Sequence, residues 1–213
     1  MVNTRPDLVY FVGYVSRFLE APREEHLVAV KRILRYVAGT RGWGVRDCAR
    51  RGKEKLELVG YGDSDMAGDV DDRKSTSEMI YFLSGGAICW QSTKQKVVVL
   101  SSCEAEYIVT SMAATQGVLL ARLMEELIGK DGDLPMLYMD NKATISLIKN
   151  LVLHDWSKHI EIRFQYIQEC ADQGLIKIDF IQTEEQLGDI FTKSLSRVKF
   201  EELRSKIEVQ IIR

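Results

Sequence analysis

The order of apolar segments after Leu56 constrains the fold more than any other feature of this chain. Three segments of strand length come first, LELVGYGD, EMIYFL and AICWQS, and a turn at 84–86 separates the last two. Longer and shorter segments then alternate: a helix over 103–128, the strand LPMLYMD, the helix NKATISLIKN, a helix over about 157–172, the strand LIKIDFI and a last helix from about Glu184. Strands followed by alternating helices and strands predict a mixed sheet with helices packed on it.

The first forty residues have a different pattern and predict two helices. DLVYFVGYVSRFLEA has apolar residues at helical spacing, and Pro22 stands at a first-turn position of PREEHLVAVKRILRYVAG, which Gly39 can end. The Gly-rich and charged stretch that follows predicts a loop or short strand. We therefore place a domain boundary near residues 50–55.

Composition excludes several classes of protein. With 213 residues and 46% hydrophobic content the chain can bury a core, but its net charge of -2 gives no general attraction to a polyanion, so a nucleic-acid surface must be a local patch. No apolar run approaches the roughly 20 residues that cross a bilayer. The four cysteines have no C-x-x-C pair and the histidines no zinc-ligand spacing. These features predict a protein of a reducing, intracellular compartment, cytoplasmic or nuclear, that is not secreted.

Carboxylates at the ends of two predicted core strands indicate where chemistry can occur. Asp63 ends the first strand, and Asp140 ends YMD. If these strands are neighbours, both carboxylates meet at one edge of the sheet. A cluster of this kind needs cations, and hard oxygen ligands are those that Mg²⁺ prefers. Each aspartate taken alone also fits the simpler role of a turn or cap residue.

Two further carboxylates can complete the cluster. Glu104 and Glu106 point to nearly opposite sides of the long helix, and only Glu106 continues into the apolar stripe through Val109 and Ala113. Glu106 is therefore predicted to face the sheet. Asp189 lies near the start of the last helix, where exposed amides favour a carboxylate, although it can also be an ordinary helix-start residue.

Five motifs occur together and in a fixed order: LVGYGDSDMAGDVDDRKSTSEMIYFLSGGAICWQSTKQ, LSSCEAEY, YMDNKAT, KHIEIRFQYI and TEEQLGDIFTK. In this order they resemble the ribonuclease H region of copia-type LTR retrotransposon Pol polyproteins. The front segments TRPDLVYFVGYVSRFL and HLVAVKRILRYVAGT resemble the end of the reverse transcriptase of the same polyprotein. The Y-x-D-D motif of the polymerase is absent, so this chain is not expected to polymerise alone.

The resemblance implies a mixed α/β, ribonuclease H-like fold with a five-stranded sheet in the order 3-2-1-4-5 and an N-terminal helical appendage. It divides the chain into a thumb- or connection-like reverse transcriptase remnant over 1–50, the ribonuclease H-like domain over 56–203 and a C-terminal tail over 204–213. It implies hydrolysis of the RNA strand of RNA/DNA hybrids with two Mg²⁺ ions, or Mn²⁺, within a longer polyprotein. The family's carboxylates fall on Asp63, Glu106, Asp140 and Asp189, and Glu104 remains the alternative for the helix position.

Other residues bear on substrate and efficiency. Arg73, Lys74, Ser75 and Lys94 are candidates for contacts to the hybrid's phosphates, although such charges are usually a solvated face. Met66 replaces the family's usual tryptophan and Glu78 its usual glycine. These departures motivate an alternative, a catalytically decayed or domesticated nucleic-acid-binding relic.

Overall fold

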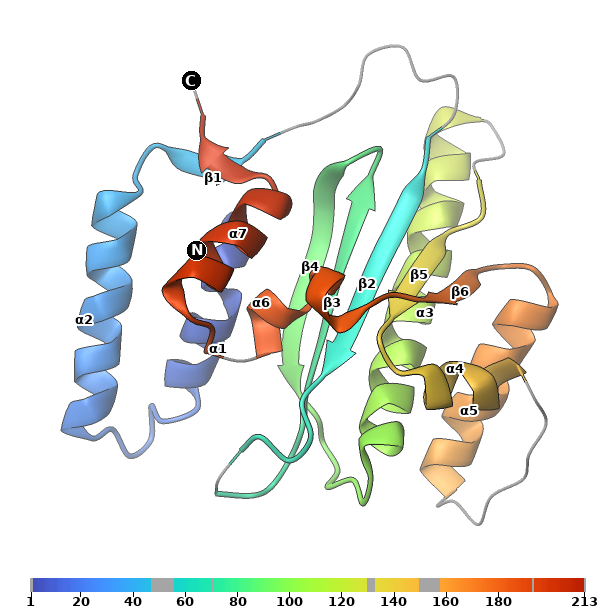
Figure 1. The fold of residues 1–213 in the computed structure, drawn as a ribbon, viewed down its shortest axis with the longest axis horizontal. Coiled ribbons are helices and arrows are strands. Elements are labelled where there is room, and N and C mark those ends of the chain that lie inside the picture. The colour runs from blue at the N-terminus through green and yellow to red at the C-terminus, as the bar shows by residue number, and fades with distance from the viewer. Residues whose placement is uncertain are drawn as a thin grey trace.

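A five-stranded mixed sheet forms the centre of the protein in the computed structural model, which describes residues 2–46, 56–69, 71–129, 133–149, 158–192 and 194–212 (Figure 1). Its order is β4-β3-β2-β5-β6, with β2, β3 and β4 antiparallel and β2, β5 and β6 parallel. Counted from β2, this is the predicted order 3-2-1-4-5, and the predicted fold is confirmed. The strands are β2 (Leu58–Ser64), β3 (Thr76–Leu83), β4 (Gly86–Lys94), β5 (Met136–Met139) and β6 (Lys177–Phe180).

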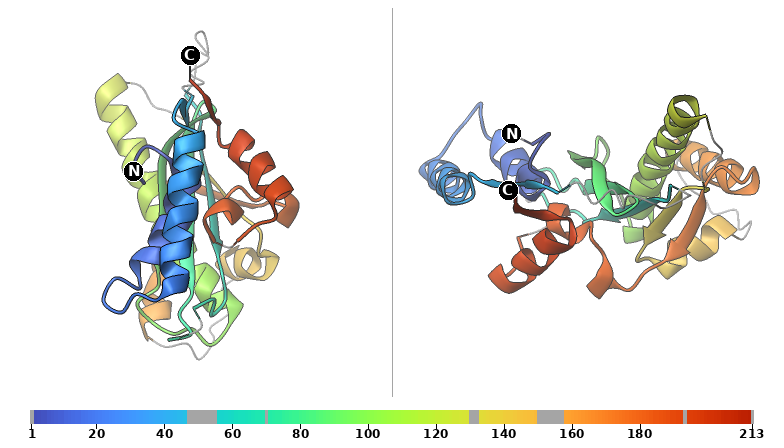
Figure 2. Two further views of the ribbon diagram at one scale, coloured as in Figure 1. Left: turned by 90° about the vertical axis from the view of Figure 1, so that its left-hand side faces the viewer. Right: turned by 90° about the horizontal axis from the view of Figure 1, so that it is seen from above.

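Helices cover both faces of this sheet (Figure 2). On one face Met79 and Tyr81 of β3 pack in a core shared with α3 (Ser102–Ile128), α4 (Lys142–Lys149) and α5 (Lys158–Asp172). On the other face Ile80 and Phe82 pack against α6 (Asp189–Thr192) and α7 (Arg197–Lys206). Alternate residues of a strand point to opposite faces, so a strand covered on both sides is apolar throughout. This explains why the segment EMIYFL shows no polar alternation.

The long helix α3 carries clear signals at both ends. The Ser101 side chain accepts a hydrogen bond from the Glu104 amide at the N-terminus, and Gly129 ends the helix in the left-handed conformation. By length and composition α3 is also apolar enough to cross a membrane, but half of its most apolar window is buried inside the protein. Its contacts with the sheet and α5 identify it as a core helix.

The N-terminal helices and the C-terminal end of the chain pack together beside β4 (Figure 1). A 3₁₀ turn (Pro6–Leu8) leads into α1 (Val9–Ser16), which is followed by α2 (Glu24–Gly39). The short strands β1 (Trp43–Val45) and β7 (Val209–Ile211) pair antiparallel. The predicted boundary at 203/204 therefore falls inside α7, and the residues of the predicted tail include a strand paired with residues 43–45. The predicted boundary near 50–55 lies outside the described residues.

A buried polar network reinforces this packing. Arg5 donates two hydrogen bonds to Asp7, 2.9 and 2.7 Å long, and two more to Thr40. The Tyr36 hydroxyl donates to Asp7 (2.6 Å), and Arg204 of α7 donates to Tyr36 (3.1 Å). Bidentate arginine–carboxylate pairs are among the stronger polar contacts. The network ties the N-terminal helices to the end of the chain.

Two local expectations differ from the structure. The second helix begins at Glu24, with Arg23 as its N-cap, so Pro22 precedes the helix. The single helix expected from Glu184 is divided into a 3₁₀ turn (Thr183–Glu185), α6 and α7. Gly188, which lies close against β2, stands directly before α6, at the first of these breaks.

Candidate active site

Three predicted carboxylates converge at the end of β2. One oxygen atom from each of Asp63, Glu106 and Asp140 lies within 4.8 Å of the other two. Asp63 comes from β2, Glu106 from the first turns of α3, and Asp140 follows β5 directly. Because β2 and β5 are parallel neighbours, their carboxyl ends lie at the same edge of the sheet. The structure thus brings together acids that are up to 77 positions apart in the sequence.

The two glutamates of α3 have different environments. Glu106 is 5% exposed and belongs to the cluster. Glu104 instead turns back to the start of the helix, where its carboxylate accepts a 2.7 Å hydrogen bond from the Leu100 amide. Ser101, the N-cap, accepts a hydrogen bond from the Glu104 amide in turn, so Glu104 takes part in capping the start of the helix. The argument from helix faces therefore places the right glutamate toward the sheet.

Glu106 is buried beside other acids, and a bound cation would offset the cost of its negative charge. Burial, together with the charge of Asp63 and then that of Asp140, raises the pKa of Glu106 well above its usual value. Ser64, adjacent to Asp63, donates a 2.9 Å hydrogen bond to one Glu106 oxygen. The other oxygen, Oε2, is buried and has no hydrogen-bond partner among the described residues. A buried carboxylate oxygen without a donor costs free energy unless a cation or proton satisfies it.

The residues present fit a divalent metal ion. Oxygens that share one Mg²⁺ at its usual bond length of about 2.1 Å can be no more than roughly 4.2 Å apart. The 4.8 Å spread of the three oxygens requires closure of less than about 1 Å to reach that limit. Three hard oxygen donors and one unsatisfied buried oxygen match the ligand preference of Mg²⁺ and Mn²⁺. This arrangement can hold a cation, although its geometry does not identify the ion.

Asp189 lies close to this cluster without belonging to the group of three. It is the first residue of α6 and is 6% exposed. The preceding Gly188 touches β2 so closely that a Cβ there would lie 2.8 Å from the Cβ of Asp63. Gln186, fully buried, donates a 2.8 Å hydrogen bond to the Gly62 carbonyl and accepts one from the Gly188 amide. The segment before α6 is thereby fixed against the strand that carries Asp63.

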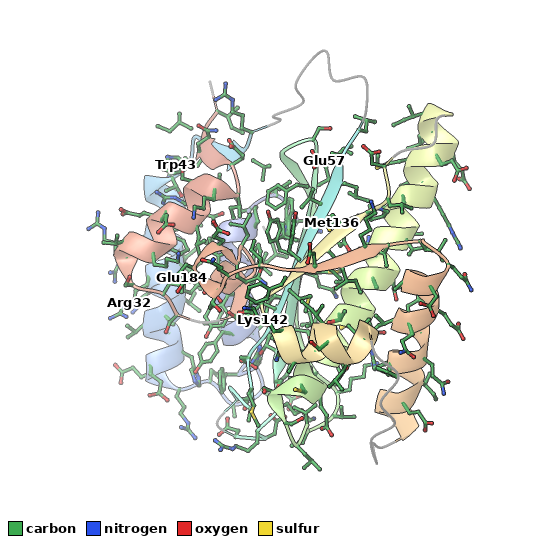
Figure 3. The ribbon with its side chains drawn as sticks, turned by 45° about the vertical axis from the view of Figure 1, so that its right-hand side comes forward. Arg32, Trp43, Glu57, Met136, Lys142 and Glu184 are labelled. Atoms are coloured by element: carbon green, nitrogen blue, oxygen red, sulfur yellow. The ribbon has the colours of Figure 1, made fainter. Side chains whose placement is uncertain are left out.

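A threonine contacts the most exposed member of the cluster. The Thr183 hydroxyl donates a 3.2 Å hydrogen bond to Asp140. Thr183 begins the 3₁₀ turn that follows β6. Nearby, the Lys142 ammonium lies 4.4 Å from the centre of the Phe180 ring, at the start of α4 (Figure 3). Ser64, Thr183 and Gln186 gave no sequence signal because ordinary polar residues acquire these roles only through the fold.

Glu78, which replaces the usual glycine, places another acid beside the cluster. It faces Asp63 directly in the β2–β3 register and is 1% exposed. The Ser92 hydroxyl donates to one oxygen at 3.2 Å, whereas Oε2 is buried without a hydrogen-bond partner among the described residues. Burial, followed by the charges of Asp63 and Asp65, raises the pKa of Glu78 well above its usual value. The other substituted residue, Met66, is 52% exposed in the loop after β2.

The four predicted substrate contacts lie on or beside the loop between β2 and β3, but they differ in availability. Arg73 is exposed and Lys74 is partly exposed. Ser75 is fully buried, and its hydroxyl accepts a hydrogen bond from the Ala67 amide. Lys94 forms ion pairs of 2.6 Å with Asp69 and 2.8 Å with Asp72. Lys74 also pairs with Asp72, at 3.5 Å, and its side chain is 31% exposed, against 28% for Lys94. The geometry thus leaves Arg73 the most accessible of the four residues and Ser75 the least.

The strand order and the acidic cluster define a ribonuclease H-like domain, and relatives by sequence define its family. No family model matches the chain. The chain is 45% identical over 201 residues to a retrovirus-related Pol polyprotein from transposon TNT 1-94 of Nicotiana tabacum, covering 94% of this chain and 15% of that protein. It is 41% identical over 206 residues to the corresponding protein from transposon RE1 of Arabidopsis thaliana, covering 97% and 14%. The chain belongs to the retrovirus-related Pol polyproteins of transposons.

Other similarities are narrower. The chain spans about one seventh of the two Pol polyproteins. Over 120 residues, 56% of this chain, it is 47% identical to secreted RxLR effector protein 161 of Plasmopara viticola, of which it covers 82%. Two solved structures are similar at 11% identity: an N-terminal RNase H domain from Mycobacterium tuberculosis (TM-score 0.48, 71% of this chain and 98% of that one) and LC11-RNase H1 in complex with an RNA/DNA hybrid (0.47, 64% and 94%). At these scores they add nothing to the fold that the strand order shows.

Proposed function

We propose that this chain is the ribonuclease H unit of a retrotransposon Pol polyprotein and hydrolyses the RNA strand of RNA/DNA hybrids with divalent metal ions. The observation that carries the proposal is the convergence of Asp63, Glu106 and Asp140 within 4.8 Å, together with a buried Glu106 oxygen that has no hydrogen-bond donor in the described part of the chain. Family membership supports the same function. The proposal includes the polyprotein as partner and an intracellular, cytoplasmic or nuclear place of action.

Each acid has a distinct part in this proposal. Two Mg²⁺ ions, or Mn²⁺, would supply an activated water and stabilise the leaving oxygen of the phosphodiester. Asp63, Glu106 and Asp140 would hold the cations through their carboxylate oxygens. Asp189, which lies nearby at the start of α6, would complete the set. Ser64 orients Glu106, and Thr183 orients Asp140, through the hydrogen bonds described above.

The two glutamates of α3 provide a matched test of this assignment. Glu106→Gln removes a cluster carboxylate, whereas Glu104→Gln removes one from the same helix outside the cluster. With purified protein, we expect titration calorimetry with Mn²⁺ and cleavage of a labelled hybrid to show that Glu106→Gln weakens metal binding and reduces the cleavage rate at least about a hundredfold. Glu104→Gln should retain both. Equal effects of the two substitutions would contradict the assignment.

A second candidate function rests on Glu78. Its buried acid faces Asp63 at a position where the family usually has no side chain. In this alternative the acid disturbs the cluster, and the protein binds nucleic acid without cutting it. A wild-type protein that binds the hybrid but does not cut it, and a Glu78→Gly variant that cuts, would favour the alternative. Cleavage by the wild-type protein would exclude it.

A further inference from the structure

The loop between β2 and β3 is built around one buried carboxylate. Asp69 is 8% exposed at its side chain. Its Oδ1 accepts hydrogen bonds from the amides of Asp71 (3.0 Å) and Asp72 (3.3 Å), and its Oδ2 accepts from Lys94 (2.6 Å). The Asp69 amide and carbonyl also bond within the loop, to Lys74 and Arg73 respectively. This single side chain therefore organises the backbone of the segment that presents Arg73 and Lys74.

A further hydrogen-bond donor to Asp69 comes from outside the ribonuclease H-like domain. Arg17, which directly follows α1, donates from one guanidinium nitrogen to Asp69 (3.3 Å) and from another to the Thr76 hydroxyl (3.2 Å). It is 20% exposed at its side chain and spans 52 positions in sequence to reach Asp69. Two donors fixed in one plane can hold two acceptors in a defined relative position, which a lysine cannot do.

This contact reaches close to the candidate site. Thr76 begins β3 and donates its amide to Asp65 at 2.6 Å, and Asp65 follows Asp63 by two residues. Arg17 therefore holds both the centre of the loop and the first residue of the strand that lies against β2. Arg73 has a positive φ of 59°, a conformation that a residue with a side chain adopts at a cost. Neighbouring contacts must stabilise such a backbone, and the Arg73 amide itself donates a 3.0 Å hydrogen bond to the Asp69 carbonyl.

We propose that Arg17 is a positioning residue for hybrid binding: the N-terminal helical unit, through Arg17, holds the β2–β3 loop in the shape that presents Arg73 and Lys74 to phosphates. The proposal rests on the proposed function and deepens it. The N-terminal unit is then part of the substrate-binding surface, and Lys94 holds the loop through its ion pair with Asp69.

The test compares Arg17→Ala, Arg17→Lys and a control, Arg35→Ala, which removes an exposed arginine from α2. Binding of a hybrid is measured by fluorescence anisotropy in Ca²⁺, and cleavage is measured separately in Mg²⁺. We expect Arg17→Ala to raise Kd and KM about fivefold, with kcat changed less than about twofold. Arg17→Lys should have an intermediate effect, and the control none.

A measurement without nucleic acid separates this proposal from the proposed function. Brief trypsin digestion followed by mass spectrometry reports cleavage after Arg73 and Lys74. We expect faster cleavage there in Arg17→Ala than in wild-type protein or in Arg35→Ala. Unchanged loop cleavage, or faster loop cleavage with unchanged Kd and KM, would overturn the proposal. Failure of the ribonuclease function alone would abolish Mg²⁺-dependent cutting and leave the changes in Kd and loop cleavage intact.

Discussion

The helix α3, which carries Glu106, packs closely against the sheet at Gly117. A Cβ at Gly117 would lie 2.5 Å from the Tyr81 hydroxyl oxygen and 3.2 Å from Ile176. Tyr81 is fully buried and donates a 2.7 Å hydrogen bond to the Ala113 carbonyl, so its ring cannot move away freely. Overpacking of this kind costs about 1–3 kcal/mol, and alanine regains up to about 1 kcal/mol in helix propensity. We expect Gly117→Ala to destabilise the protein by about 1 kcal/mol.

A double-mutant cycle isolates the clash. Tyr81→Phe removes the nearest atom and one hydrogen bond, at a cost of about 1 kcal/mol. In the Tyr81→Phe background, Gly117→Ala should change the free energy of unfolding very little. The double variant should therefore be more stable than the sum of the two single effects predicts, by at least about 1 kcal/mol. Gly13 of α1 has open space where a Cβ would lie, so Gly13→Ala is the control and should not destabilise. Urea unfolding followed by circular dichroism measures all variants. Additive effects at Gly117 and Tyr81 would refute the packing argument.

Two further predictions concern pH. Although burial opposes the shift, hydrogen bonds from Lys94 and backbone amides lower the pKa of Asp69 from 3.8 to about 2, which corresponds to roughly 2.4 kcal/mol, or about 1–2 kcal/mol after solvent screening. This stability is complete above about pH 4 and is lost only as the pH falls through the folded pKa near 2. Asp69→Asn should therefore destabilise clearly less at pH 2.5 than at pH 7 in urea titrations, and equal losses would contradict it. The raised pKa of Glu78 gives the opposite pH dependence of stability. The contribution of Glu78 to stability is complete below its unfolded pKa and is lost as the pH rises and the buried carboxyl ionises. Glu78→Gln should therefore raise Tm more at pH 8 than at pH 5 in metal-free buffer, and a pH-independent difference would count against this account.

Local pattern predicted a mixed sheet with helices packed on it and located the strands β2 and β5 that end in Asp63 and Asp140. That these two strands are neighbours followed only from the strand order that the resemblance implies. Helical spacing separated Glu106 from Glu104, because the apolar stripe of α3 fixes which side faces the sheet. In the case of the glutamates, neighbouring residues along the chain carry the information.

Features that depend on distant residues could not be predicted in the same way. The strands β1 and β7 have three residues each and pair only because α7 returns to the N-terminal helices. In the sequence, Arg17 and Lys94 have the pattern of ordinary surface charges. Only the fold brings both of them into contact with Asp69. Likewise, the break before Asp189 coincides with the close approach of Gly188 to Asp63, which no local pattern records.

Cleavage of a labelled RNA/DNA hybrid by the purified chain, in Mg²⁺ and in EDTA, tests the central claim most directly. We predict metal-dependent cutting of the RNA strand alone, which Asp63→Asn abolishes while circular dichroism shows an unchanged fold. Cutting that persists in EDTA or in the Asp63→Asn variant would contradict the proposed site. No cutting by folded wild-type protein would contradict the proposed function.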